Sequence, residues 1–185
     1  MIITSQEEWE SWALIGAQLP TNILINTSLP IKITTIHRNI YVTVGGWSVV
    51  EFVPPRNEKK IIIATDNSTV YCRGGGEIIA HKRAHIEAYD KSIIWAHDES
   101  SVFAFNNSFI KGYDSSTTMA HNSCQVTLYG KAALTAGMDI KDKVVVKVFG
   151  SGKVKATNNT KVLSGNFKGS FSGVTIPWNR SVPSM

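Results

Sequence analysis

The sequence predicts an all-β protein that is built as a parallel β-helix, or β-solenoid, and two observations carry this prediction. Blocks of eight residues repeat without a gap from Asn57 to Ala136, and they resume over residues 141–172 after a skip of Gly137–Ile140. The columns of this repeat alternate in character with a period of two, which is typical of strands and does not fit a helix. Each block is therefore expected to form one short strand and one corner.

The columns of the repeat have distinct physical roles. Column six is a branched aliphatic residue in nearly every block, for example Ile62, Val70 and Ile78, while columns four and eight are mostly Ser and Ala. Residues two apart share one face of a strand, so columns four, six and eight are expected to line the core. Column two holds Asp, Asn or Gly in nearly every block, and these residues tolerate the left-handed backbone of a tight turn.

The number of blocks that close one coil is the remaining question. We predict three blocks in each coil of a triangular solenoid with four to five coils, because this spacing groups outward aromatic residues. The alternative is a coil of two blocks. The three-block spacing also aligns three acidic corner residues, which are Asp66, Asp90 and Asp114. A right-handed solenoid is expected, since parallel crossovers are right-handed as a rule.

The run EAYDKSIIWAHDESSVFAFNNS resembles the Ala-Tyr-Asp-Ser-Ala-x-Val octapeptide arrays found in β-solenoid proteins of bacteriophages and bacteria. The repeat covers 112 of the 185 residues, counted over 57–136 and 141–172. The resemblance implies a β-helix and an origin in a phage or a mobile element. It supplies no catalytic residues.

The chain is expected to form one structural domain with three parts: an N-terminal cap over residues 1–56, the solenoid over 57–172 and a C-terminal tail over 173–185. Ser5 and Glu8 form a capping-box pattern that predicts a short helix over residues 5–16. Residues 22–53 are rich in β-branched residues and predict irregular first coils with a capping hairpin. Solenoids need caps because an uncovered end strand can pair with another chain.

Positive charge gathers near the C-terminus. Residues 131–185 hold nine Lys or Arg against two Asp, whereas residues 1–130 hold ten basic and twelve acidic residues. This segregation indicates attraction to an acidic partner. The lysines that we predict to bind a polyanion are Lys147, Lys153, Lys155, Lys161 and Lys168.

Several outward positions are apolar, and these predict a second binding surface. At the three-block spacing Tyr71, Trp95 and Met119 form one stripe, with Phe103 in the neighbouring stripe. Outward residues of a solenoid are expected to be polar unless something covers them. The cap helix, the C-terminal tail, a second copy of the chain in a homo-oligomer, or a ligand such as a sugar or base would provide that cover.

The polar candidates have structural explanations. The aligned Asp66, Asp90 and Asp114 could bind calcium or cleave glycosides, but each can equally form an Asx turn at its own corner. His81, His97 and His121 share column one without further zinc ligands, and Cys72 and Cys124 fall on inward columns. We predict no catalytic residue, no metal and no cofactor.

The favoured function is a non-catalytic, phage-derived β-solenoid that binds a host or virion protein or a polyanion. The alternatives are a glycan-binding or glycan-cleaving β-helix of tail-fibre or depolymerase type, and an inhibitor that binds nucleic acid. The sequence shows no stretch long enough to span a membrane and no secretion signal. The expected location is the cytoplasm of the host cell or the virion.

Overall fold

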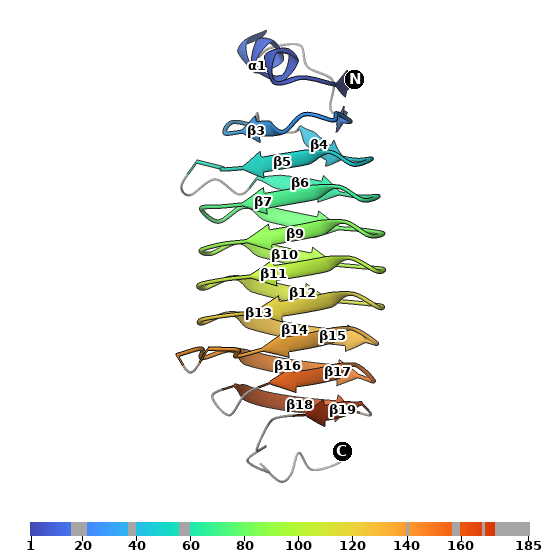
Figure 1. Ribbon diagram of the computed structural model, residues 1–185, viewed down its shortest axis with the longest axis vertical. Helices are drawn as coiled ribbons and strands as arrows, with labels where there is room; N and C mark the ends of the chain where they lie inside the picture. The colour runs from blue at the N-terminus through green and yellow to red at the C-terminus, as the bar shows by residue number, and fades with distance from the viewer. Residues whose placement is uncertain are drawn as a thin grey trace.

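The computed structural model describes residues 1–15, 22–36, 40–55, 60–139, 141–156, 160–167 and 169–172. The fold is an all-β parallel β-solenoid of about eight turns with a single short helix at its N-terminal end. Strands stack along the long axis of the molecule, and the described chain runs from the helix at one end to the last coil at the other (Figure 1). This confirms the predicted fold class.

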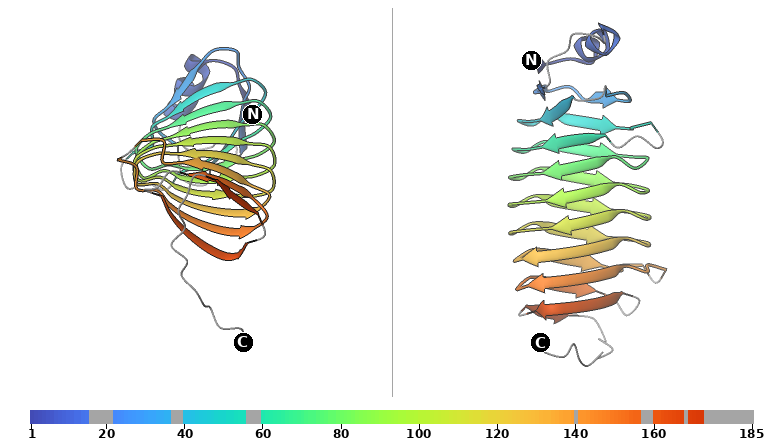
Figure 2. Two further views of the ribbon diagram at one scale, coloured as in Figure 1. Left: turned by 60° about the horizontal axis from the view of Figure 1, so that its bottom comes forward. Right: turned by 180° about the vertical axis from the view of Figure 1, so that it is seen from behind.

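Two parallel sheets, which we call sheet A and sheet B, form the walls of the solenoid, and the chain crosses from one to the other at every corner (Figures 1 and 2). Sheet A contains, in spatial order, β1 (Ile2–Ile3), β2 (Asn22–Ile25), β4 (Tyr41–Val44), β6 (Ile61–Ala64), β8 (Glu77–Ala80), β10 (Ile93–Ala96), β12 (Phe109–Gly112), β14 (Gln125–Gly130), β16 (Val145–Gly150) and β18 (Lys161–Phe167). Sheet B contains β3 (Ile31–Ile33), β5 (Val49–Phe52), β7 (Thr69–Cys72), β9 (His85–Ala88), β11 (Ser101–Ala104), β13 (Thr117–Ala120), β15 (Ala133–Ala136), β17 (Lys153–Ala156) and β19 (Ser170–Ser172).

The strand register shows that two blocks close a coil, so the predicted triangular coil of three blocks is wrong. Ile94 pairs with Ile78 on one side and with Ile110 on the other, and Thr118 stacks on Val102 in the opposite sheet. The physical reason lies in the size of the inward side chains. Columns eight and four are mostly Ala and Ser, which together with one Ile or Val fill the narrow space between two sheets but would leave a three-walled interior empty.

Residues with a left-handed backbone form the corners. Column two has φ near +60°, for example 61° at Asp66, 57° at Asp98 and 60° at Asn106. At several corners the column-two side chain of the next coil accepts this backbone N–H: Asp98 Oδ2 lies 2.8 Å from the Lys82 nitrogen, and Asn122 Oδ1 lies 3.0 Å from the Asn106 nitrogen. The predicted role of column two as a turn former is therefore refined, because these side chains cap the preceding corner rather than their own.

Irregular stretches of the sequence lie at corners, and the strands on either side of them keep the register of the repeat. After the skip of residues 137–140, Val126 pairs with Val146 and Leu134 pairs with Val154, as the predicted frame requires. At the corner after β7, Gly76 leaves room for a large core residue: a Cβ there would lie 2.4 Å from the Phe52 ring. Both corners keep the inward columns continuous from coil to coil.

The N-terminal end is closed by β1 and by α1 (Gln6–Ile15), close to the predicted helix over residues 5–16. Ser5 Oγ accepts the Glu8 backbone N–H at 3.2 Å, but the Glu8 carboxylate accepts the Thr4 N–H at 2.7 Å instead of returning to Ser5. The predicted hairpin over residues 22–53 is wrong, because the strands described there all pair in parallel with the two sheets.

Candidate binding surfaces

The two-block coil separates the residues that the sequence grouped into one apolar stripe. Trp95 lies on β10 in sheet A, whereas Tyr71, Phe103 and Met119 lie on sheet B. Along sheet B the order is Tyr71, Glu87, Phe103 and Met119, so an acidic residue interrupts the row. The predicted stripe of Tyr71, Trp95 and Met119 is therefore not a surface of this molecule.

A different apolar surface runs along the outside of sheet A, and we call it the sheet A patch. Its rows follow the register of β6, β8, β10 and β12, and its residues are half-buried against one another except for the exposed Phe109. The members are Ile61, Ile63, Ile79, Ile93, Trp95 and Phe109. The exposed Tyr41 on β4 continues the patch toward the N-terminus.

Two charged residues lie within the sheet A patch: Glu77 stands between two isoleucines on β8, and Lys111 stands on β12 at the C-terminal edge. Glu77 pairs with Ile61 and Ile93 in one row, and Lys111 follows Trp95 in the other row. The Lys111 ammonium group lies 4.4 Å from the centre of the Trp95 ring, a cation–π contact. The Trp95 indole N–H is covered and has no hydrogen-bond partner. The row Ile63, Ile79 and Trp95 is therefore uninterrupted, whereas Glu77 interrupts the row of Ile61, Ile93 and Phe109.

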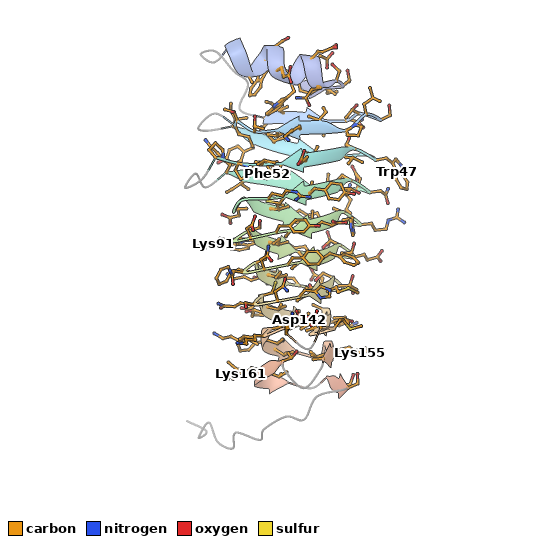
Figure 3. All side chains as sticks on the ribbon, turned by 60° about the vertical axis from the view of Figure 1, so that its left-hand side comes forward. Trp47, Phe52, Lys91, Asp142, Lys155 and Lys161 are labelled. Carbon is orange, nitrogen blue, oxygen red and sulfur yellow. The ribbon has the colours of Figure 1, made fainter. Side chains whose placement is uncertain are left out.

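Lysines dominate the C-terminal coils, and we call this set the lysine belt. Its side chains are exposed, and no ion pair joins them to the residues that the structure describes; the set is Lys131, Lys141, Lys143, Lys147, Lys153, Lys155 and Lys161. Lys155 on sheet B and Lys161 on sheet A point to different sides of the solenoid (Figure 3). The predicted Lys168 lies outside the described residues.

A shallow depression on sheet B lies within reach of the lysine belt. Small side chains such as Ala133, Thr135 and Ser170 form its floor, and Lys153 and Lys155 stand beside them. Hydroxyl groups and two ammonium groups therefore face the same open surface. This arrangement suits an anionic chain that lies flat on the sheet.

The three aspartates predicted to stack do not meet. Asp66 and Asp114 lie in one corner column, in which the φ-positive residues follow the order Asp66, Lys82, Asp98, Asp114, and Asp90 lies at the opposite corner. The predicted calcium or acid–base trio is therefore not assembled. Hydrogen bonds from Lys82 and Gly46 lower the pKa of Asp66, and a backbone hydrogen bond from Lys82 lowers the pKa of Asp98. A general acid at neutral pH needs the opposite shift.

Column one forms two ladders of stacked rings, one at each corner. Neighbouring ring centroids are 4.6–5.5 Å apart along the first ladder and 5.0–5.2 Å apart along the second. The first ladder is His81, His97, Tyr113, Tyr129 and Phe149, and the second is Tyr89, Phe105 and His121. His97 and His121, which a coil of three blocks would place in adjacent coils, lie at different corners. Such ladders stabilise the stacking of coils without a ligand.

One polar cluster on sheet B was not predicted from the sequence. His85 Nδ1 lies 2.9 Å from Ser101 Oγ, His85 Nε2 lies 3.7 Å from Glu87 Oε1, and the Tyr89 hydroxyl donates to Glu87 at 3.0 Å. The two-block spacing between His85 and Ser101 would have revealed it. The order serine–histidine–carboxylate matches a hydrolytic triad, but an oxyanion site needs free donors. The backbone N–H groups of β11 instead bond to the adjacent coil.

The two cysteines are buried core residues, as the inward columns predicted. Burial raises the pKa of the Cys124 thiol to about 11, and burial also raises the pKa of Cys72. Both thiols therefore stay protonated and unreactive at neutral pH. Within the described ranges, no three His, Cys, Asp or Glu side chains come together as a metal site.

Comparison with protein-family models, with curated proteins and with solved structures gives no match. Among the residues described, no helix is long and apolar enough to cross a membrane. The molecule belongs to the class of parallel β-solenoids, and its function has to be argued from its own surfaces.

Proposed function

We propose that this protein works by binding, and that the lysine belt binds a linear polyanion. The observation that carries the proposal is the set of seven exposed lysines on the last described coils, without an ion pair to any described residue. Two lysines of the N-terminal half form ion pairs instead: Lys32 pairs with Glu51 at 3.2 Å, and Lys82 pairs with Asp66 at 2.6 Å. Within the described ranges, positive charge is therefore least compensated on the C-terminal coils, where it creates an attractive field for anions.

The spacing of the lysines suits a polymer of negative charge. Lys153 and Lys155 stand on the same side of one strand, about 7 Å apart, and adjacent coils are about 4.8 Å apart. Phosphates of a nucleic-acid strand and acidic groups of a glycan repeat at comparable distances. Each lysine that replaces a counterion on such a polymer adds a salt-dependent increment to the affinity.

The placement of the belt favours a flexible polymer over a rigid duplex. Lys147 and Lys161 face outward from sheet A, whereas Lys153 and Lys155 face outward from sheet B. A straight duplex can touch only one of these faces at a time. A single strand of nucleic acid or an anionic glycan can bend around the corner that carries Lys131 and contact both faces.

Binding without catalysis is supported by the chemistry of the candidate groups. Asp66 and Asp98 are held in their ionised form, and the His85–Ser101–Glu87 cluster lacks an oxyanion site. The phage origin implied by the octapeptide resemblance is part of the same proposal, with a host or virion macromolecule as the source of the polyanion and the host cytoplasm or the virion as the location.

The test is fluorescence anisotropy with labelled single-stranded oligothymidine, the matching duplex and heparin over a range of salt. We expect binding of the two flexible polymers with a log–log salt slope of about −0.7 for each phosphate neutralised on single-stranded DNA. The triple variant Lys153→Gln, Lys155→Gln and Lys161→Gln should lower the affinity at least tenfold. Negligible binding of all three polymers at low salt would overturn the proposal.

The matched control changes basic residues outside the belt. Arg83 and Lys91 are exposed corner residues of the middle coils, and the double variant Arg83→Gln and Lys91→Gln removes two charges at a distance from the belt (Figure 3 labels Lys91). This variant should keep most of the affinity. An equal loss in both variants would show that net charge alone, rather than the belt, determines binding.

A further inference from the structure

The outer faces of the two sheets differ in polarity although they belong to the same coils. Over the coils of β6 to β12 six of the eight outward residues of sheet A are apolar, and Glu77 and Lys111 are the two charged ones; the apolar residues are Ile61, Ile63, Ile79, Ile93, Trp95 and Phe109. On sheet B the corresponding strands β7, β9 and β11 present two apolar outward residues, Tyr71 and Phe103, among four polar ones, which are Thr69, His85, Glu87 and Ser101. A large apolar surface of this kind on one face is typical of a face that another protein surface covers.

We infer that the sheet A patch binds a second copy of this chain, in a two-fold dimer with antiparallel solenoids. Two-fold interfaces bring the same patch of both copies together. A second copy also has the same coil spacing of about 4.8 Å, so ridges and grooves of the two faces match over several coils. This inference does not depend on the polyanion proposal, because the lysine belt lies on later coils.

Charge complementarity fixes the orientation. A two-fold axis that runs parallel to the strands and passes over β10 turns the second copy upside down, so that β8 of one copy faces β12 of the other. Glu77 on β8 then faces the strand that carries Lys111 of the second copy, and the symmetry repeats this pair. In a dimer with parallel solenoids the two residues would stay two coils apart, about 10 Å.

The contact with Trp95 supplies a reason why the dimer would remain weak. Lys111 lies over the Trp95 ring at 4.4 Å in the single chain and must leave it to reach Glu77 of the second copy. With Tyr41 the patch extends over five strands, roughly 24 Å, and buries on the order of 700 Å² in total, below the size of a standard stable interface. We therefore expect a reversible dimer with a dissociation constant of roughly 10–100 μM.

Sedimentation velocity over a concentration series tests the inference, with a full-length chain throughout. The variant Trp95→Glu should raise the dissociation constant at least tenfold. The control Phe103→Glu adds the same charge to an outward position of sheet B and should leave the dimer unchanged. Circular dichroism on both variants checks that the fold is kept.

Charge reversal tests the antiparallel arrangement. Glu77→Lys and Lys111→Glu should each weaken the dimer about tenfold, and the double variant should restore it to within about threefold of the starting value, because each pair is re-formed with its signs exchanged. A chain that stays monomeric at several times the expected dissociation constant would overturn the inference. Dimerisation that survives Trp95→Glu but not Phe103→Glu would overturn it as well, since sheet B would then be the interface.

Discussion

The first and the last described coils oppose pairing with another chain by different means. At the N-terminal end, Trp9 and Trp12 of α1 are buried in the core, and the Gln6 side chain pairs with the edge strand β3: its oxygen accepts the Lys32 N–H at 2.7 Å and its amide donates to the Lys32 carbonyl at 3.2 Å. At the C-terminal end, β18 is the last described strand of sheet A and presents Lys161, whereas β17, which presents Lys153 and Lys155, pairs with β19.

The difference teaches that pairing with another chain can be opposed either by cover or by charge. Gln6 satisfies the Lys32 backbone groups of β3 as an extra strand would. Lys161 on β18, the last described strand of sheet A, opposes pairing with another strand through its charge. A lysine that we propose to attract a polyanion is therefore also placed to oppose strand pairing.

The largest expected loss of stability comes from truncating a buried tryptophan of the N-terminal helix. Trp9 is 2% exposed and contacts Trp12 with ring centroids 5.2 Å apart. Trp9→Ala should lower the free energy of unfolding by about 3–5 kcal/mol. Val162→Ala in the last described coil of sheet A, where the side chain is 8% exposed, should cost only about 1–2 kcal/mol. Urea unfolding measures both, and equal losses would contradict the distinction between the two ends.

A second prediction concerns the enlarged corner near the C-terminal coils. Asp142 is fully buried, and its carboxylate accepts the backbone N–H groups of Asn122 at 2.6 Å and Asp139 at 3.1 Å, with His121 Nδ1 3.3 Å away. Asp142→Ala should cost about 1–3 kcal/mol because two partly buried backbone donors lose their acceptor. Asp142→Asn keeps one acceptor oxygen and should cost less. A neutral effect of Asp142→Ala in urea unfolding would show that water replaces the carboxylate.

The smallest effect is a pH dependence from the acidic corners. The pKa of Asp98 is lowered in the folded chain by the hydrogen bond from the Lys82 nitrogen, with a smaller contribution from the nearby His81. A lowered pKa contributes stability above the unfolded value of about 3.9, and this contribution is lost as the pH falls through the folded value. The melting temperature should therefore drop on acidification below about pH 4. Asp98→Asn should reduce the size of that drop, and an unchanged drop would contradict this assignment.

The sequence predicted the strands and the core well, because column periodicity reports directly which side chains point inward. Ile62, Val70 and Ile78 are fully buried at column six, and Ala64 and Ala80 at column eight. The closure of the coil was not recovered, because the periodicity of the inward columns alone fits coils of two and of three blocks equally well. The small size of the Ala and Ser columns, and the alternation of apolar and polar outward residues between successive blocks, were the signals for two.

The binding surfaces depended on that closure, which is why they were predicted only in part. The lysines of the belt follow from composition and needed no register. The sheet A patch could be predicted only with the correct register, because Ile79 and Trp95 are neighbours only when coils are two blocks long. Trp47 is 78% exposed at the corner between β4 and β5 (Figure 3). It lies before the octapeptide repeat, so the columns of the repeat could not predict its exposure.

The two-block coil also constrains how such a gene can change. Duplicating a pair of blocks inside the regular array would add one coil and leave every downstream residue on its original side. Duplicating a single block would send each downstream strand to the opposite wall, so Trp95 and Lys161 would exchange sides with Phe103 and Lys155. Evolution can therefore lengthen this solenoid by whole coils and keep its outer surfaces. Insertion of a single block would change the outward residues of both sheets.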